Sequence, residues 1–384
     1  MNVEATTVYL DNNATTAVAP ECAAAMMACL ESNYANPSSK HPLGMAAKQA
    51  VGEARGKVAR FLKAGQAEIV FTGGASESNH TAIMAALALN PGKRHIVTSR
   101  VEHPSVLLLL QHLETRGVRV TYLPVDGNGR LSLDDFERSL GEDTALASLM
   151  WANNETGVLF PVAEAAEIAK AKGVLFHTDA VQAAGRVEID LERVPADLLS
   201  FSGHKLHAPK GIGALFVRKG IKLPPLFFGH QERGRRGGTE NVPAIAALGA
   251  ACELAVAGLA ERNARIAALR DKLEAGVLAS MPGAQINGAG AERLSNTSSI
   301  RCGETDSEIV LDRLSKVGIC ASAGSACTAG GTDPSHVLIA MGLGRSGALA
   351  TIRFSLSRYS REDDVDRVVE VLSGINWTAA AQAA

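Results

Sequence analysis

Short apolar runs alternate with helix-length amphipathic stretches through the middle of the chain. The stretches predict helices, for example over residues 77–89, 105–116 and 163–170. The apolar runs predict strands over residues 68–71, 95–99, 119–123, 145–151, 174–178, 198–201 and 214–217. Strands that alternate with helices are typical of a mostly parallel sheet that is covered on both faces. The pattern therefore predicts an α/β fold whose active site lies beyond the carboxyl ends of the strands.

The pattern changes after a long amphipathic stretch over residues 259–280. A helical pattern at 307–315 lies between strand-like runs at 296–301 and 351–355, which predicts a second, smaller α+β domain. We expect a large domain over residues 16–258, and a small domain formed by residues 1–15 together with 259–384. The small domain would carry a mobile glycine-rich arm at about residues 321–332, which contains Cys327.

Composition and charge narrow the class of protein. A length of 384 residues suffices for two well-buried cores, and a net charge of −2 gives no electrostatic reason to expect nucleic acid as a partner. The N-terminal residues resemble no signal peptide, and the apolar window at 242–260 carries Glu253 and begins next to a proline. We therefore expect a cytoplasmic protein without a membrane span. The six cysteines form no CxxC pair, which argues against zinc and ferredoxin sites and predicts mostly reduced, buried thiols.

Candidate chemistry begins with Lys205 and Asp179, which each follow an expected strand closely. Chemistry with pyridoxal 5′-phosphate (PLP) requires an amine that condenses with the aldehyde and a carboxylate that keeps the ring nitrogen protonated. Asp179 lies in a segment otherwise too apolar for an unpaired carboxylate, and a pyridinium would supply its cationic partner. A structural ion pair or a helix cap is the alternative for Asp179, and Lys210 is the competing amine. Ser202 and His204 favour Lys205, because they flank it with hydroxyl and imidazole donors suited to a phosphate.

A glycine-containing turn over residues 72–78 follows the strand expected at 68–71 and begins a helix. Glycines permit close backbone approach, and a helix N-terminus presents N–H groups to an anion, to which Ser76 can add a hydroxyl. The alternative is an ordinary strand-to-helix turn capped by serine. Gln182 can donate to the ring oxygen next to the aldehyde, or else be a satisfied turn amide. The basic loop over residues 229–241 allows both a phosphate-binding role and a solvated run of charges.

Four further residues are candidates for contact with cofactor or substrate. His103 can stack on a pyridine ring and move protons, or simply begin a helix. Asn154 can contact the cofactor or a substrate amine, although adjacent asparagines are also common turn formers. Arg353 lies inside an apolar strand, where its guanidinium needs an anion, either a substrate carboxylate or an acidic side chain. Cys327 is a candidate reactive thiol, with an incidental free thiol as the alternative.

Short motifs with a common resemblance are distributed over nearly the whole chain. They are residues 9–16 (YLDNNATT), 36–39 (NPSS), 102–104 (EHP), 150–152 (MWA), 153–157 (NNETG), 177–182 (HTDAVQ), 203–211 (GHKLHAPKG), 229–236 (GHQERGRR) and 325–328 (SACT). Together they resemble the cysteine desulfurases of the NifS/IscS group in the class V aminotransferase family, and most closely the nitrogen-fixation (NifS) type.

The resemblance implies a PLP-dependent transferase of fold type I, whose large domain has a mostly parallel seven-stranded sheet. It also implies a homodimer with the active site at the subunit interface. Lys205 would bind the aldehyde, and Asp179 would pair with the ring nitrogen. His103 would stack on the ring as acid and base, while Gln182 would bond the ring oxygen. The phosphate would be held by Ala75, Ser76, Ser202, His204 and the partner subunit's Thr239, with Ser76 in a position where relatives often carry threonine.

The resemblance further implies conversion of L-cysteine to L-alanine. Asn154 would contact cofactor and substrate, Arg353 would bind the substrate, and Cys327 would hold the sulfur as a persulfide. The sulfur would pass to an iron–sulfur scaffold of the NifU-like kind that serves nitrogenase, and Cys327 could there ligate a [2Fe–2S] cluster transiently.

Other functions remain open at this point. A housekeeping iron–sulfur desulfurase, a selenocysteine lyase or an aminotransferase would have the same fold. A non-catalytic sulfur carrier belongs to another class, and in such a protein Lys205 and Asp179 would have no purpose.

Overall fold

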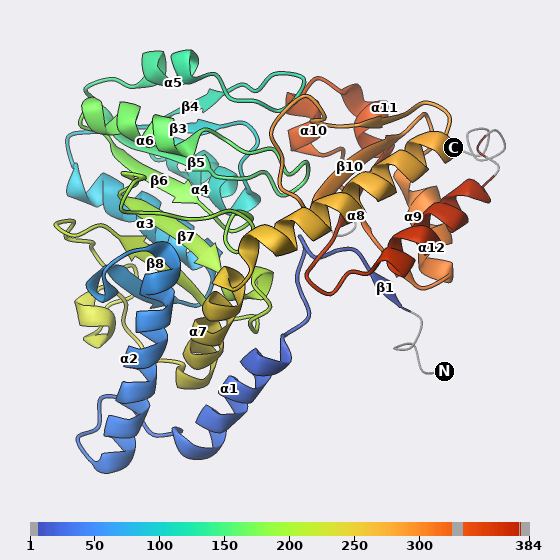
Figure 1. Cartoon of the computed structure of the whole chain (residues 1–384). Helices are drawn as coiled ribbons and strands as arrows, with labels where there is room; N and C mark the ends of the chain where they lie inside the picture. The colour runs from blue at the N-terminus through green and yellow to red at the C-terminus, as the bar shows by residue number, and fades with distance from the viewer. Residues whose placement is uncertain (1–6, 325–332, 376, 378–384) are drawn as a thin grey trace.

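A seven-stranded sheet forms the centre of the molecule (Figure 1). The structure is a computed structural model that describes residues 7–324, 333–375 and 377. In spatial order the strands are β2 (Ile69–Thr72), β8 (Gly213–Val217), β7 (Leu198–Ser202), β6 (Leu175–Asp179), β5 (Thr144–Met150), β3 (His95–Ser99) and β4 (Arg119–Leu123). Strand β8 is antiparallel to both neighbours, and the other neighbouring pairs are parallel. Every expected strand is present, with ends within one residue of those expected, and the predicted α/β fold is confirmed.

Helices cover both faces of this sheet. They are α1 (Pro20–Ser32), α2 (Pro42–Leu62), α3 (Ala75–Leu89), α4 (Pro104–Glu114), α5 (Leu133–Ser139), α6 (Val162–Ala171) and α7 (Val242–Val256). Ile96 of β3 and Leu146 of β5 belong to one buried cluster, which includes residues of α3 and α4. The next residues along the strands, Val97 and Ala147, belong to a different cluster. Because successive side chains of a strand point to opposite faces, the sheet is buried on both sides.

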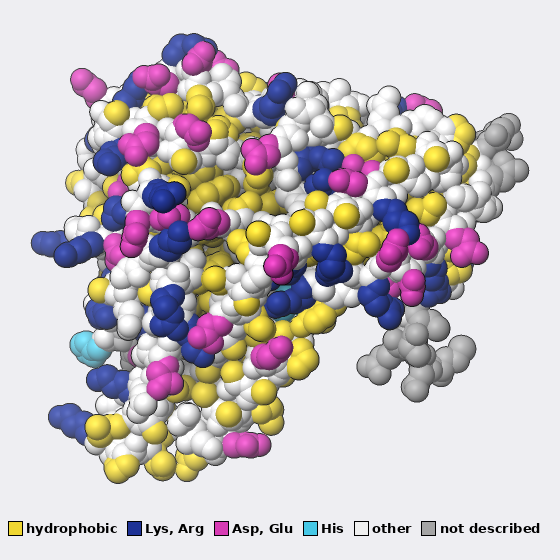
Figure 2. Space-filling model, in the orientation of Figure 1, with side chains coloured by type: hydrophobic (Ala, Val, Ile, Leu, Met, Phe, Trp, Pro, Cys, Tyr) yellow, Lys and Arg dark blue, Asp and Glu magenta, His cyan; other side chains and the backbone are white. Residues whose placement is uncertain are grey.

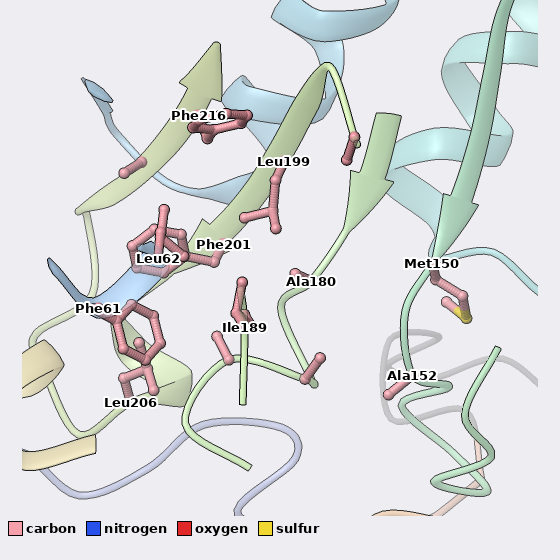
Figure 3. Close-up of a cluster of buried hydrophobic side chains, with 14 of the residues drawn as sticks. Phe61, Leu62, Met150, Ala152, Ala180, Ile189, Leu199, Phe201, Leu206 and Phe216 are labelled. Atoms are coloured by element: carbon pink, nitrogen blue, oxygen red, sulfur yellow. The ribbon is translucent and has the colours of Figure 1, made fainter. Parts of the chain in front are cut away.

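The largest buried cluster lies beside the strand ends that carry predicted site residues. Figure 3 shows Phe61, Phe201 and Leu206 gathered near the end of β7, and the rings of Phe61 and Phe201 lie 5.8 Å apart between centroids. Met150 and Ala152 belong to the same cluster at the end of β5. Close packing of this kind leaves the ends of β5 and β7 little freedom, so polar side chains that project there have defined positions.

The C-terminal part contains a second sheet. Its four antiparallel strands are, in order, β12 (Ser322–Ala323), β13 (Thr351–Ser355), β10 (Thr297–Cys302) and β9 (Ala284–Ile286). Strand β1 (Val8–Tyr9) pairs in parallel with β11 (Ile319–Cys320). The helices of this part are α8 (Leu259–Ser280), α9 (Ser307–Lys316), α10 (His336–Ala340), α11 (Gly344–Leu349) and α12 (Glu362–Ser373).

The buried clusters support the expected division of the chain, which we retain as a proposal. Val8 and Leu10 share a separate buried cluster with residues of α8, β10 and α12. This packing supports a small domain that combines residues 1–15 with 259–384, next to a large domain over 16–258. Helices α10 and α11 differ from the rest of the small part, because Val337 and Ala348 belong to the cluster of the large domain.

The cysteines in the described ranges are free, and most of them are buried. Burial raises the pKa of the Cys22 thiol to about 11 and that of Cys302 to about 12, which makes them poor nucleophiles near neutral pH. Cys320 is exposed. Over the same ranges, no single helix is both long and apolar enough to cross a membrane, and α7 and α8 meet both conditions only when taken together, as a pair bent by 76°.

Candidate active site

A cleft of about 760 Å³ opens where β5, β6 and β7 end. All predicted site residues except Thr239 and Cys327 line it, namely Ala75, Ser76, His103, Asn154, Asp179, Gln182, Ser202, His204, Lys205 and Arg353. Thr239 is exposed and does not line the cleft of its own chain, and Cys327 lies outside the described residues. The fold thus brings together residues that are up to 278 positions apart in the sequence, from Ala75 to Arg353.

Lys205 closes a short 3₁₀ turn, Gly203–Lys205, that follows β7 directly. A Cβ at Gly203 would lie 2.9 Å from Ile212 Cγ2, so only glycine allows this turn to pack against the core. Lys205 Nζ donates to the carbonyl oxygens of Asn13 and Ala14, at 2.5 and 2.6 Å. The competing amine, Lys210, also borders the cleft but is exposed.

Asp179 ends β6, and only 5% of it is exposed. Its Oδ2 accepts from Asn79 Nδ2 at 2.7 Å, and its Oδ1 accepts from the backbone N–H of Val181 at 3.0 Å. Asn79, a fully buried residue of α3, was not predicted as part of the site. Two N–H donors therefore hold the Asp179 carboxylate in the lining of the cleft. Both hydrogen bonds stabilise the ionised form of this carboxylate.

Helix α3 begins at the cleft. The alternative prediction for this turn was an ordinary helix start capped by serine, and no serine side chain among the described residues caps it. Its N-cap is Gly74, with φ at +153°, and no side chain in the described ranges caps it. The first-turn N–H groups therefore have no side-chain cap among the described residues, and Ala75 and Ser76 of this turn line the cleft. A Cβ at Gly213 would lie 2.8 Å from Gly74 Cα, so a second glycine permits this close approach of β8. A helix N-terminus beside hydroxyl and imidazole side chains is a suitable phosphate site.

Glu77 places a negative charge beside this helix N-terminus. Its Oε2 accepts from the Gly73 N–H at 2.7 Å, and its Oε1 pairs with Arg236 at 2.9 Å. Arg236 comes from the basic loop at 229–241, for which a solvated run of charges was one prediction. The loop is instead tied to the cleft, and Arg236 neutralises a carboxylate that would repel an anion.

His103 is the N-cap of α4. Its Nδ1 accepts from the Ser105 N–H at 3.1 Å and lies 2.9 Å from Ser105 Oγ. Burial lowers the pKa of His103, Lys205 and His336 lower it further, and Asp179 opposes them. His103 is therefore a helix-start residue that also lines the cleft, while its stacking on a pyridine ring and its proton transfer stay predictions.

Glu102 directly precedes His103 in the sequence and is completely buried. Its Oε1 accepts from Ser99 Oγ at 2.6 Å and from the Met150 N–H at 3.0 Å. Burial raises the pKa of this carboxyl to about 8. Glu102 thereby ties the segment after β3 to the end of β5, which fixes the backbone that carries His103.

Arg353 is almost fully buried in β13 and reaches the cleft from the C-terminal part. Its Nη2 pairs with Asp11 Oδ1 at 2.8 Å, and its Nη1 donates to Asn154 O at 3.1 Å. Its Nε is buried and has no hydrogen-bond partner within the described part of the chain. The acidic partner that was the alternative for Arg353 is thus present, and Arg353 itself also lines the cleft.

The N-terminal segment supplies cleft residues that the sequence did not identify. Asn13 O accepts from Gln182 Nε2 at 3.1 Å as well as from Lys205, and Asn13 and Ala14 both line the cleft. Gln182 also accepts from Arg186 at 2.8 Å through its Oε1. The motif at 9–16 marked this segment as part of a family pattern, but nothing local indicated that it would meet Lys205.

The donors that line the cleft fit PLP. A buried carboxylate at Asp179 suits a protonated ring nitrogen, and the primary amine of Lys205 suits an aldehyde. The uncapped start of α3, together with Ser202 and His204, suits a phosphate. Over the described residues, no cluster of histidine, cysteine or acidic side chains could hold a metal ion.

We expect Glu232→Ala to destabilise the protein by about 3–5 kcal/mol, because it leaves the largely buried Arg55 guanidinium without its carboxylate. Glu232 receives two hydrogen bonds from Arg55, at 2.6 and 2.7 Å, and one from the Phe71 N–H at 3.0 Å. Urea denaturation of both proteins measures the difference. Glu188→Ala is the control, because its pair with Lys63 is exposed, and we expect a change below about 1 kcal/mol. A loss no larger than that of the control would contradict the assigned role of the Arg55–Glu232 pair.

Comparison with known proteins places the chain in one family. The model of the aminotransferase class-V family matches residues 8–368. The cysteine desulfurase of Trichormus azollae is 50% identical over 96% of this chain and 92% of its own length. The cysteine desulfurase NifS of Azotobacter vinelandii is 49% identical over 94% and 90%, respectively. A solved structure of a NifS-like protein superimposes with a TM-score of 0.90 at 38% identity, covering 96% of this chain and 98% of the other. The chain therefore belongs to the aminotransferase class-V family of PLP-dependent enzymes.

Proposed function

We propose that this protein is a PLP-dependent cysteine desulfurase, which converts L-cysteine to L-alanine and holds the sulfur as a persulfide on Cys327. The observation that carries the proposal is the meeting of Lys205, Asp179 and the uncapped start of α3 in one cleft. Relatives at about half identity over nearly the whole chain bear the name cysteine desulfurase, which supports the choice of reaction.

Several residues of the cleft would each contact a different part of the cofactor. Bound PLP supplies an aldehyde that condenses with amines and a ring that accepts an electron pair. Lys205 Nζ would hold the aldehyde, and its amine would remove the proton from the substrate α-carbon and return it when alanine forms. Asp179 keeps the ring nitrogen protonated, and His103 stacks on the ring. Gln182 donates to the ring oxygen from the position that its bond to Asn13 defines.

The phosphate lies at the start of α3 in this proposal. Ala75 and Ser76 contribute the first helical turn, while Ser202 and His204 contribute a hydroxyl and an imidazole from the end of β7. These four residues all line the cleft, and Lys205 lies next in sequence to His204. His204 at the phosphate and Lys205 at the aldehyde would thus be neighbours in the same 3₁₀ turn.

The substrate carboxylate would be bound by Arg353, which lines the cleft, and Asn154 would contribute a second polar contact. The Cys327 thiolate then attacks the substrate sulfur. A sulfur–sulfur bond forms, the carbon–sulfur bond breaks, and its electron pair remains on the carbon, which takes up a proton to give alanine. Asp11 keeps Arg353 in place during this sequence.

We further propose a homodimer in which the partner subunit's Thr239 completes the phosphate site. In support, Thr239 is exposed and lies outside the cleft of its own chain. Large apolar side chains are exposed nearby in sequence, and Phe228 is 87% exposed. Others, among them Met27, Tyr34 and Met45, lie on or between α1 and α2, where Figure 2 shows hydrophobic side chains at the surface. Exposed apolar side chains of this size are typical of an interface.

In our proposal the sulfur acceptor is an iron–sulfur scaffold protein of the NifU-like kind in the cytoplasm. The iron–sulfur cluster that is assembled there serves nitrogenase. The similarity to the NifS of Azotobacter vinelandii supports this choice. Cys327 must be a reduced thiol at the start of each turnover, and the cytosol keeps thiols reduced, which suits a cytoplasmic reaction. Ligation of a [2Fe–2S] cluster by Cys327 on the scaffold belongs to the same proposal.

Cys327→Ala tests the proposal most directly. The variant should retain the visible absorbance of bound PLP and yet release neither sulfide nor alanine from cysteine in the presence of a reductant. The matched control is Cys320→Ala, which removes an exposed thiol of the same region and should leave sulfide release unchanged. Full sulfide production by Cys327→Ala would refute the assignment of the sulfur acceptor.

The same assay separates the other functions. An aminotransferase would require a keto acid as amino acceptor and would not depend on Cys327. A non-catalytic sulfur carrier would be colourless after purification and unaffected by borohydride.

A further inference from the structure

We propose that Asn79 and Ser105 are positioning residues, which connect Asp179 to His103 and hold the His103 imidazole with its proton on Nε2. The inference rests on the function proposed above, because that function gives Asp179 and His103 their roles. Asn79 is fully buried in α3, and Ser105 lies at the start of α4 and lines the cleft. Neither residue was identified from the sequence.

Three hydrogen bonds in series connect the carboxylate to the imidazole. Asn79 Nδ2 donates to Asp179 Oδ2 at 2.7 Å and to Ser105 Oγ at 3.1 Å. Ser105 Oγ in turn lies 2.9 Å from His103 Nδ1. A primary amide nitrogen carries two hydrogens, so Asn79 makes both of its bonds at once.

The direction of each bond follows from the charge on Asp179. An ionised carboxylate only accepts hydrogen bonds, so Asn79 must turn its nitrogen toward it. The Asn79 Oδ1 then lies on the other side, buried and without a partner among the described residues. Burial of an unpaired carbonyl is unfavourable, so the two bonds made by the nitrogen must hold the amide in this orientation. Ser105 Oγ accepts from Asn79, and its own hydrogen is left to be donated to His103 Nδ1.

His103 Nδ1 accepts a second hydrogen bond, from the backbone N–H of Ser105 at 3.1 Å. A ring nitrogen that accepts from two donors carries no hydrogen of its own. The neutral imidazole therefore has its proton on Nε2. Burial supports the neutral form, because it lowers the pKa of His103 below the ordinary value.

This tautomer divides the proton transfers between two residues. His103 acts through Nε2–H as a hydrogen-bond donor in the cleft, and removal of the substrate α-proton is left to Lys205 Nζ. The opposite tautomer would present a base at Nε2 instead of a donor. Asp179, which keeps the ring nitrogen protonated, is connected to His103 through Asn79 and Ser105. Asp179 thereby also sets which nitrogen of the His103 imidazole carries the proton.

Nitrogen-15 NMR of the holoenzyme with labelled histidine tests the tautomer directly, with His103 assigned by comparison with His103→Gln. We expect the signal of a non-protonated nitrogen at Nδ1 and of a protonated nitrogen at Nε2. In Ser105→Ala the Nδ1 signal should move, because one donor to it is lost. Thr81→Ala is the matched control, since Thr81 Oγ1 bonds only within α3, and it should leave the His103 signals in place. A protonated Nδ1 in the unmodified enzyme would overturn the inference.

Kinetics of the same variants test the functional link. Ser105→Ala and Asn79→Ala should each lower kcat about tenfold with little change in KM, because a bond that orients a reacting group is lost. The double variant should be about as slow as either single one, as expected for a single connected series, and Ser105→Thr should restore the rate by restoring the hydroxyl. Independent, multiplying losses would overturn the connection. If the enzyme had no desulfurase activity at all, the NMR result would still decide the tautomer, so the two proposals fail separately.

Discussion

Lys205→Arg is expected to abolish the conversion of cysteine to alanine, with a loss in kcat of about 10⁴-fold or more. Arginine preserves the positive charge and can still donate to the carbonyl oxygens of Asn13 and Ala14, which Lys205 contacts at 2.5 and 2.6 Å. A guanidinium cannot condense with an aldehyde, and it does not lose its proton near neutral pH, so it cannot remove the substrate α-proton. Lys205→Arg therefore removes both functions of Lys205 and keeps its positive charge and its hydrogen bonds to the two carbonyl oxygens.

Borohydride reduction followed by peptide mass spectrometry measures the covalent link separately from activity. In the unmodified protein the PLP adduct should be found on the peptide that contains Lys205, and in Lys205→Arg it should be absent. Lys210→Arg is the matched control, because Lys210 borders the same cleft but is exposed. This variant should keep the adduct at Lys205. An adduct on Lys210, or none in the unmodified protein, would contradict the proposed function.

Asp179→Asn is expected to lower kcat by about 10²–10⁴-fold, which is the usual contribution of a well-placed acid or base. Asparagine has the same shape but no charge, so it cannot keep the ring nitrogen protonated and the ring becomes a poorer electron acceptor. The amide of Asn79, which donates to Asp179 at 2.7 Å, would then face a second amide. Steady-state kinetics at saturating PLP separate this effect from weaker cofactor binding.

Asp197→Asn controls for the loss of a partly buried carboxylate next to the same sheet, just before β7. Asp197 accepts from the Phe176 N–H at 2.9 Å and does not line the cleft, so its replacement should affect stability more than kcat. If Asp179→Asn retained more than a tenth of the activity, Asp179 would not be the partner of the ring nitrogen, and the proposed mechanism would need another proton holder.

Hydrophobic periodicity determined most of the elements correctly. The strand expected at 95–99 and the helical stretch at 259–280 have the expected bounds, as β3 and α8. Such patterns are local, because they depend on the side-chain period of a single helix or strand. The position of Lys205 and Asp179 in the cleft was also predictable, since reactive residue types after apolar strands are visible in the sequence itself.

Partner choice could not be predicted in the same way. The sequence left open whether Arg353 binds an acidic side chain, and the fold places Asp11 beside it at 2.8 Å, 342 positions away. Asn79 resembled any helical asparagine until α3 placed it 2.7 Å from Asp179. Hydrogen-bond partners depend on distances of a few ångströms between distant segments, and no local pattern encodes them.

The sequence by itself thus determined the α/β class, the position of the strands and the residue types that the chemistry requires. Only the tertiary structure decided the order of the strands, the antiparallel direction of β8 and the arrival of Asn13 and Ala14 at Lys205. The physical reason is that secondary structure follows from neighbouring side chains, whereas the cleft is formed where chain segments far apart in sequence pack against one core.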